Sequence, residues 1–548
     1  MRHALACFVL VSACALATSD PEARASWPDE PFFPVYHVRP PSGHVNDPNG
    51  PFRDPGTGLV HLLMQYCAEG PCGNQSLPAQ NQQAVTHFVS ADLARWQWVG
   101  TPLRPAGAAD APDDCADELG VYSGSTTLVD GAPHYVYPGV HWDAATDAVA
   151  MSQCVATPAN RSDPRLANWT KRTIIPASAT PRGLSRHFHD DSEAFVGPDG
   201  RWWLFVSGKA CGGNATGDCP EPDPSVEHAY GVNYLFSSAD FVDWRPEHSL
   251  FNITDGECPY VSCPELYSLP GMAEGQAVFE ALCGRDWYWL GAFDAEAVAF
   301  APDPPTAVGK YDWGKGHASK SFWDAATRRR LLWTWIPGAF PCAGGAPCDS
   351  MQSVPREVSY DAALGALRVL PVAELAALRD GAPLAALARA ALGAAPERVA
   401  AGDALDLELN FSCVAEPGAP TACRAAVRVR AADDGAGHVE VACALDARDG
   451  EPPAGNVTIH AAGNFTPAPV DARARLHFAD GERPTGCALR VLVDRSVIEV
   501  YAQDGRVAMS HAAVPADAAW QGVDLLATAG DVLVDARVYR MGSAFIEP

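Results

Sequence analysis

A turn sequence that recurs at nearly constant spacing constrains the fold of this chain more than any other feature. The segments Ser90–Trp96, Ser162–Trp169 and Ser238–Trp244 each combine a serine, an aspartate, a large apolar residue and a closing tryptophan. Their spacing of roughly seventy residues suits one four-stranded antiparallel sheet per repeat, and the region has room for about five such sheets. Sheets of this size repeated around an axis form a β-propeller, so we predict a five-bladed propeller.

The region from residue 30 to 371 supports this prediction because strand–turn–strand patterns fill it. Short apolar or alternating runs are separated by turn sequences such as DG and PDG, as β-hairpins require. Examples are Leu59–Tyr66, Ser125–Tyr137, Glu193–Ser207 and Ala277–Phe293.

Residues 372–399 differ in composition and separate this region from a second one. The stretch is rich in Ala and Leu and is interrupted by Gly381 and Pro383, which predicts short helical turns in a linker. From 400 to 548 the β pattern returns, and the alternating runs predict a β-sandwich. Those runs are Leu405–Leu409, Ala425–Val429, Leu489–Tyr501 and Asp531–Tyr539. The expected fold is therefore all-β, a propeller followed by a sandwich.

Length and charge agree with two domains and limit the class of partner. A chain of 548 residues exceeds what one core usually holds. The formal net charge of -27 argues against nucleic acid and anionic membrane surfaces, which both select for basic patches. A neutral substrate such as a sugar is indifferent to that charge, and the 15 tryptophans suit either half-buried strands or stacking on sugar rings.

The N-terminus and the asparagines indicate a secretory protein. Residues 1–19 read as a signal peptide, with Arg2 and His3 before the apolar run Ala4–Ala17, and no later segment is apolar enough for a membrane anchor. Eight asparagines begin N-x-S/T sequons, which predicts N-linked glycans and an extracellular or vacuolar protein. They are Asn74, Asn160, Asn168, Asn214, Asn252, Asn410, Asn456 and Asn464.

The cysteines are expected to form disulfides in that oxidising compartment. Of the 17 cysteines, Cys7 and Cys14 lie in the leader, and the odd remainder of fifteen leaves at least one thiol free, for which Cys154 and Cys443 are the candidates. No CxxC pair or nearby histidine favours a metal site, so no metal or organic cofactor is expected. The short-range disulfide candidates are Cys67/Cys72, Cys211/Cys219, Cys258/Cys263, Cys342/Cys348 and Cys413/Cys423.

Three carboxyl-bearing segments are candidates for chemistry, because glycoside cleavage needs two carboxyl groups on either side of one bond. Asp47 lies in the turn sequence His44–Gly50, His189–Glu193 enters an apolar strand, and Glu257–Glu265 is rich in cysteine and proline. Each can also be an ordinary solvated turn or loop.

These segments resemble the motifs of glycoside hydrolase family 32, which contains invertases, inulinases, levanases and fructan exohydrolases. HVNDPNG (44–50) is similar to the WMNDPNG box of that family, and further motifs follow in the family's order through both halves of the chain. They are His61–Tyr66, Thr86–Trp96, Val121–Ser125, Tyr311–Phe322, Val354–Glu357, Val493–Tyr501 and Asp504–Arg506. Any one match is weak, but their order over both regions is specific.

The resemblance implies a five-bladed propeller, a β-sandwich and a retaining mechanism on fructosyl bonds. By position, Asp47 would attack the anomeric carbon of fructose, and Asp190 would bind sugar hydroxyls and stabilise the transition state. Asn46, Gln65 and Ser123 would line the fructose site, and His189 is expected to bind substrate with them.

The chain departs from the family pattern at three places. His44 replaces a tryptophan, and His189 replaces the arginine of the RDP motif, which loses a fixed charge and a forked donor. The motif WECPDLF aligns with Val261–Tyr267, which places Ser262 where the acid/base glutamate belongs. A serine is no general acid near neutral pH.

Two residues could replace that glutamate. Glu257 repeats the ECP core five residues earlier, whereas Glu265 would point to the opposite strand face from position 262. The sequence therefore predicts a retaining β-fructosidase acting on sucrose or a fructan, with Glu257 as the preferred acid/base. A family member that binds sugar without cleaving it, or a fructosyltransferase, are the alternatives, and no oligomeric state is indicated.

Overall fold

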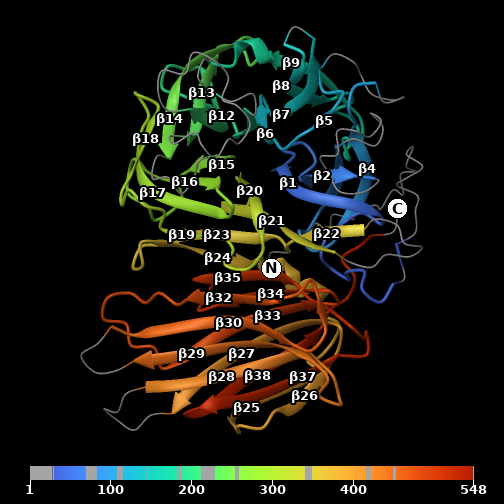
Figure 1. Ribbon diagram of the computed structural model, residues 1–548, viewed down its shortest axis with the longest axis vertical. Helices are drawn as coiled ribbons and strands as arrows, with labels where there is room; N and C mark the ends of the chain where they lie inside the picture. The colour runs from blue at the N-terminus through green and yellow to red at the C-terminus, as the bar shows by residue number, and fades with distance from the viewer. Residues whose placement is uncertain are drawn as a thin grey trace, which may run out of the picture.

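Strands make up almost all of the chain, and their pairings divide it into a ring of antiparallel units followed by two larger sheets (Figure 1). The structure is a computed structural model that describes residues 27–28, 30–68, 83–107, 115–144, 146–181, 184, 188–211, 229–253, 258, 260–339, 348–414, 421–447 and 452–546. The predicted all-β propeller followed by a β-sandwich is confirmed.

The ring consists of five successive strand groups in the described chain. The first holds β1 (Gly43–Arg53), β2 (Val60–Cys67), β3 (Ala84–Ser90) and β4 (Gln97–Leu103). The second holds β5 (Gly120–Val121), β6 (Ser125–Val129), β7 (Ala132–Asp143), β8 (Ala148–Pro158) and β9 (Trp169–Ile175), followed by the 3-10 helix η3 (Ala177–Ala179). The third holds β10 (His189–Asp191), β11 (Phe195–Val196), β12 (Trp202–Cys211), β13 (Ala229–Ser238) and β14 (Trp244–Ile253).

The fourth group holds β15 (Ser262–Tyr267), β16 (Gln276–Leu282), β17 (Asp286–Asp294), β18 (Ala299–Pro302) and β19 (Gly309–Lys310). The fifth holds β20 (His317–Asp324), β21 (Arg329–Ala339), β23 (Arg356–Asp361) and β24 (Ala366–Pro371). A further strand, β22 (Cys348–Gln352), pairs with β21 and also runs parallel to β1, so the last group joins the first and closes the ring.

The recurring Ser-Asp-Trp sequence forms the same turn in three groups, between the last two strands of the sheet. The carboxylates of Asp92, Asp163 and Asp240 each accept hydrogen bonds from two backbone N–H groups of their own turn. Asp294 and Asp361 do the same in the fourth and fifth groups, where the surrounding sequence no longer matches. The repeat is therefore a real structural period.

The second domain is a sandwich of two six-stranded sheets around a shared apolar core. One sheet has the order β25 (Ala385–Leu392), β38 (Asp531–Arg540), β27 (Ala404–Val414), β33 (Gly486–Asp494), β34 (Val497–Ala502) and β35 (Val507–Ala512). The other has the order β26 (Glu397–Ala401), β37 (Gly522–Ala529), β28 (Thr421–Ala431), β29 (His438–Ala447), β30 (Ala454–Ala462) and β32 (Asp471–Arg475). The short strands β31 (Phe465–Thr466) and β36 (Val514–Pro515) form a separate pair.

The linker prediction for residues 372–399 is wrong over most of its length. A 3-10 helix, η5 (Ala373–Leu378), occupies its start, but β25 and β26 follow and pair with β38 and β37 of the sandwich. Hydrogen bonding to the edge strands of the two sandwich sheets overrides the helix preference of alanine and leucine.

The two domains meet along a buried polar network beside a continuous apolar cluster. Glu499 on β34 accepts hydrogen bonds from Arg356 on β23 and from the backbone of Val354, and it also contacts His37 before β1. In Figure 1, β34 and β35 lie at the face of the sandwich nearest β23 and β24 of the propeller. The Val354–Glu357 and Val493–Tyr501 motifs therefore hold the domains together.

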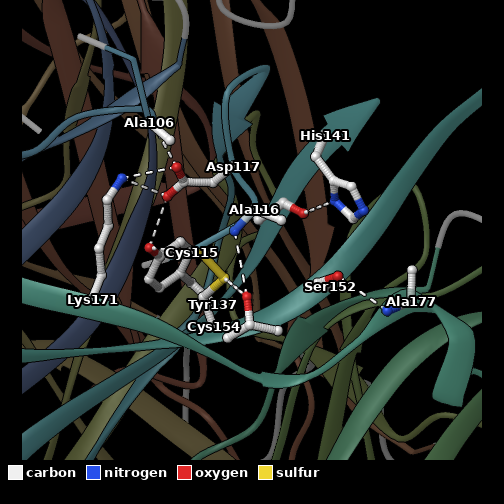
Figure 2. Close-up of a disulfide and its surroundings, with 12 residues drawn as sticks. Ala106, Cys115, Ala116, Asp117, Tyr137, His141, Ser152, Cys154, Lys171 and Ala177 are labelled. Carbon is white, nitrogen blue, oxygen red and sulfur yellow. Dashed lines mark hydrogen bonds and ion pairs between the residues drawn. A yellow bond between two sulfur atoms is a disulfide. The ribbon is translucent and has the colours of Figure 1, made fainter. Parts of the chain in front are cut away.

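Disulfides follow the predicted pairing only in part. Cys413–Cys423 is confirmed, but Cys258 pairs with Cys283, and Cys263 is the free thiol among the described residues. Neither Cys154 nor Cys443 is free. Cys154 forms a disulfide with Cys115 (Figure 2), and Cys443 forms one with Cys487. At least one cysteine of each other predicted pair, Cys72, Cys219 and Cys342, lies outside the described residues, as does the leader.

Candidate active site

The site lies where the first strands of the propeller groups approach one another, around β1, β6, β15 and β20 in the middle of the ring (Figure 1). Several of these strands carry a bulge near their start, with register shifts in β1, β10, β15 and β20. Asp190 and Cys263 have positive φ angles of 64° and 49° at these bulges. A bulge changes the direction of a side chain, and such strained residues concentrate at functional sites.

Asp47 is held from the neighbouring strand group by a short chain of hydrogen bonds. The Ser123 hydroxyl donates to Asp47 Oδ2 at 2.6 Å, and the Gln65 amide in turn donates to the Ser123 hydroxyl. Gln65 comes from β2 and Ser123 from the segment between β5 and β6. The structure therefore brings together three residues that the sequence predicted for one site.

Asp190 faces the same place from β10. Its Oδ2 accepts the backbone N–H of Cys263 at 3.0 Å, and its Oδ1 lies 3.0 Å from His189 Nδ1. Burial would raise the pKa of Asp190, but its contacts with His189, Lys320 and the Cys263 backbone lower it below the ordinary value. Asp190 is therefore a carboxylate at neutral pH.

Cys263 joins the two aspartates, which the sequence analysis missed. Its Sγ lies 3.6 Å from Asp47 Oδ2 and 3.6 Å from Asp190 Oδ2. Burial and then the charges of the two aspartates raise the pKa of this thiol well above its usual range, so it stays a neutral S–H donor. Its place in the SCPE segment was the available signal, but the nearby Cys258 made a disulfide the simpler interpretation.

Asp47 differs from Asp190 in its protonation. Its pKa is raised to about 6, chiefly by burial and further by the charge of Asp190, while the Ser123 hydrogen bond and His317 oppose the rise. Two carboxyl groups whose environments separate their pKa values are a recurring feature of acid–base sites. Above about pH 6 the Asp47 carboxylate is ionised and is available as a nucleophile.

The acid/base position holds no carboxyl group among the described residues. Ser262, which the motif alignment assigns to this position, begins β15 and is buried. Glu265 is committed elsewhere, because its carboxylate accepts hydrogen bonds from the backbone N–H and hydroxyl of Ser321 and lies 3.5 Å from Arg330. Glu257, the preferred candidate, lies outside the described residues.

His189 and Asn46 complete the predicted set. His189 contacts Asp190 through Nδ1, and its Nε2 is hydrogen-bonded to the Tyr260 hydroxyl, a partner that no sequence motif indicated. The backbone oxygen of Asn46 accepts a hydrogen bond from Gln352, and its buried side-chain oxygen has no partner in the described chain. A sugar hydroxyl is the kind of group that such an oxygen accepts.

Neither a metal cluster nor a membrane-spanning helix is found in the described parts of the chain. No three His, Cys, Asp or Glu side chains there are grouped to hold a metal ion. No helix in those parts has the length and apolarity needed to cross a bilayer.

Comparisons with known proteins agree with the fold and the motifs. The model of the glycosyl hydrolases family 32 N-terminal domain matches residues 37–219 and 223–371, and the model of the C-terminal domain of that family matches residues 377–540.

Two curated relatives are plant enzymes. An insoluble beta-fructofuranosidase isoenzyme 2 of Oryza sativa is 31% identical over 378 residues, which cover 64% of this chain and 57% of that protein. The matched part therefore spans little more than half of the rice protein. The acid beta-fructofuranosidase of Solanum lycopersicum is 27% identical over 94% of this chain and 82% of its own length.

Among solved structures, fructan 1-exohydrolase IIa of Cichorium intybus, in complex with 1-kestose, superposes with a TM-score of 0.78. The superposition covers 94% of this chain and 99% of that one at 23% identity, which supports the fold.

Proposed function

The chain belongs to glycosyl hydrolase family 32, and from this premise we propose that it hydrolyses β-fructofuranosyl bonds of sucrose or a fructan with retention of configuration. The observation that carries the proposal is the pair of a part-buried Asp47 and a buried Asp190, linked by Cys263 and hydrogen-bonded from Ser123 and Cys263.

The proposed mechanism begins with attack by Asp47 on the anomeric carbon. Ser123 orients the Asp47 carboxylate, and the raised pKa keeps it basic enough to form a bond to carbon while still ionised above about pH 6. Asp190 stays ionised and stabilises the positive charge that develops on the fructosyl ring. Water then hydrolyses the fructosyl ester of Asp47.

Asn46 and Gln65 are proposed to bind fructose hydroxyls beside these carboxylates, while the contact of His189 with Asp190 holds that carboxylate in place. The unpartnered side-chain oxygen of Asn46 is suited to accept from a hydroxyl. The plant beta-fructofuranosidases, whose names state their activity, support the substrate class.

A secreted or vacuolar location is also proposed. The leader-like N-terminus and the sequons support it, since Asn160, Asn168, Asn410 and Asn464 are exposed and accessible to glycosylation.

The second candidate is a sugar-binding member of the family that does not cleave its ligand, and Ser262 at the acid/base position favours it. Incubating the purified protein with sucrose and with inulin, and measuring released fructose beside an Asp47→Asn control, separates the two. Fructose release that disappears in the control is expected. Absence of release from a folded protein that still binds fructosides would instead support the binding function.

A further inference from the structure

The site needs a proton for the leaving sugar, and none of the three described carboxyl groups predicted from the motifs is free to supply it. Asp47 is the nucleophile of the proposed reaction, Asp190 is held ionised, and Glu265 is bound to Ser321 and Arg330. An alkoxide of glucose or fructose is too basic to leave unprotonated at useful rates, so a general acid is worth about 10²–10⁴-fold.

A pair of side chains that can pass a proton to one another contacts Asp190. His189 bridges Asp190 and Tyr260, with Nδ1 at 3.0 Å from Asp190 Oδ1 and Nε2 hydrogen-bonded to the Tyr260 hydroxyl. The His189 side chain is only 14% exposed. Because both ring nitrogens are engaged, a proton on the imidazole leaves through the Tyr260 hydroxyl.

The strand arrangement puts this pair next to position 262. Tyr260 precedes Ser262 by two residues, and the Cys263 backbone N–H ties the start of β15 to Asp190 on β10. Cys263 also places its Sγ 3.6 Å from Asp47, so contacts through Asp190 and Cys263 connect the His189–Tyr260 pair to Asp47.

We propose, resting on the fructosidase function above, that Tyr260 is the catalytic acid/base in place of the missing glutamate and that His189 holds the proton Tyr260 delivers. In the first step Asp47 bonds to the anomeric carbon and the carbon–oxygen bond to the leaving sugar breaks. The leaving oxygen takes the Tyr260 proton, and the tyrosine regains one from His189. In the second step water attacks the same carbon, its proton returns through Tyr260 to His189, and Asp47 is released.

In this proposal, two departures from the family pattern are linked: the histidine at position 189 compensates for the absence of the glutamate at position 262. The guanidinium of an arginine at 189 cannot give up a proton, whereas the ring nitrogens of a histidine can donate or accept one. Losing the glutamate at 262 is tolerated because histidine replaced arginine at 189. The groups facing this pair are Asp190, Asp47 and Cys263, with Asp191 and Lys320 behind Asp190.

The test compares sucrose with p-nitrophenyl β-D-fructofuranoside, whose nitrophenolate leaves without protonation. In full-length His189→Gln and Tyr260→Phe variants, kcat/KM on sucrose is expected to fall by about 100-fold or more. On the aryl substrate, kcat/KM of the variants is expected to stay within about fivefold of the wild-type value. An initial burst of nitrophenol is expected as well, because hydrolysis of the fructosyl ester of Asp47 becomes rate-limiting. The alkaline limb of the sucrose pH profile is expected to be absent on the aryl substrate.

Two further variants make the test decisive. In Ser262→Glu/His189→Arg, which restores both family residues, adding Tyr260→Phe is expected to cost little on sucrose. Glu257→Gln is assayed on both substrates beside these variants to ask whether Glu257 supplies the proton instead, and thermal unfolding verifies that every variant is folded.

Two results would overturn the proposal while leaving the fructosidase function in place. One is a leaving-group-dependent loss in Glu257→Gln with none in His189→Gln. The other is an equal loss on both substrates in His189→Gln and Tyr260→Phe. Failure of the wild type to cleave either substrate would instead overturn the fructosidase function itself.

Discussion

The hydroxyl of Ser123 helps to set the pH at which the Asp47 carboxyl group ionises. A hydrogen bond donated to a carboxylate favours the ionised form, and Ser123 opposes the rise of the Asp47 pKa to about 6. Ser123→Ala is therefore expected to raise this pKa and move the acid limb of the pH profile of kcat/KM to higher pH. Activity would fall most below pH 6.

Ser125→Ala is the matched control, because the Ser125 hydroxyl donates to the backbone oxygen of Asp191 and not to Asp47. Its acid limb is expected to stay at the wild-type pH. Equal shifts in the two variants would mean that the limb reports a general disturbance of this segment.

Asp191 presents the opposite case, a carboxyl group buried without compensation. Neither of its oxygens has a hydrogen-bond partner in another described residue, and burial, followed by the charge of Asp190, raises its pKa well above the ordinary value. The folded protein holds it protonated where the unfolded chain ionises it. The free energy of unfolding therefore falls as pH rises above about 4. The total loss is about 1.4 kcal/mol for each unit by which the pKa of Asp191 in the folded protein exceeds its pKa in the unfolded chain.

The side chain of Asn resembles a protonated aspartate. The free energy of unfolding of Asp191→Asn, measured in urea, is therefore expected to equal that of the wild type at pH 4 and to be larger at pH 7.5. Asp199→Asn should behave oppositely, because the backbone of Arg201 and the Trp203 indole lower the pKa of that exposed carboxylate. A gain for Asp191→Asn that is the same at both pH values would contradict the explanation.

At this scale the sequence predicts residues whose role lies in a motif and misses those whose role lies in a contact. Asp47, Gln65, Ser123 and Asp190 could be predicted because each of these four residues matches a residue of the family's motifs. Tyr260 and the free thiol of Cys263 depend on which strands become neighbours, and no local pattern encodes that.

At the scale of elements, one buried ion pair fixes how the first propeller group continues into the second (Figure 2). Lys171 on β9 donates to both oxygens of Asp117 at 2.8 and 2.7 Å, and neither side chain is exposed. Asp117 also accepts from Tyr137 on β7 and from the backbone of Ala106 after β4. The neighbouring disulfide Cys115–Cys154 closes a loop of 39 residues, worth about 4 kcal/mol in the chain-entropy model.

Lys171→Met is expected to destabilise the protein by about 3–5 kcal/mol, because it leaves a buried carboxylate unpaired. Lys171→Met/Asp117→Asn should recover part of that loss in urea unfolding, since no charge then remains to bury. A double variant that is less stable than Lys171→Met would show that Asp117 acts through Tyr137 and Ala106 instead.

The sequence predicted strands correctly where apolar and polar residues alternate. It failed where pairing with a distant strand determines the secondary structure. The Asp turns and alternating runs predicted the strands of both domains, and the sandwich runs at 405–409, 425–429 and 531–539 all lie in strands. The run 489–501 is two strands, β33 and β34, joined at Arg495 with a φ of 52°. The alanine-rich run 385–392 is a strand because β38 offers it a partner, which composition cannot show.

For the whole molecule, His37 is the residue on which the union of the two domains most depends. Its Nδ1 lies 2.9 Å from Asp494 and its Nε2 lies 2.8 Å from Glu499, and all three side chains are fully buried. Arg356 of the propeller contacts Glu499 at 2.7 Å and Asp312 at 3.0 Å. The network therefore ties the N-terminal segment, the propeller and the sandwich to one another.

The titration of His37 should be visible in the stability of the whole protein. Burial would lower its pKa, but its hydrogen bonds with Asp494 and Glu499 raise it to about 9. Since the folded pKa exceeds the unfolded value near 6.5, the stabilisation is complete below pH 6.5 and is lost as pH rises through about 9, with a size of about 3 kcal/mol. Glu499 determines how stability depends on pH in acid. Burial alone would raise its pKa, but Arg356 and His37 lower it to about 2. The stabilisation that Glu499 contributes is therefore lost as pH falls from about 4.5 toward 2.

His37→Gln is expected to lower the urea midpoint of unfolding most between about pH 4.5 and 6.5. The difference between the midpoints of the wild type and the variant should become smaller toward pH 9, because the wild type itself loses stability there. His460→Gln is the matched control, since His460 contacts Asp471 on the sandwich surface, where both side chains are more than half exposed, and solvent screens such pairs. Its midpoint should follow the wild type at every pH. A deficit in His37→Gln that stays constant from pH 5 to 9 would mean that the imidazole fills space between the domains without carrying a charge there.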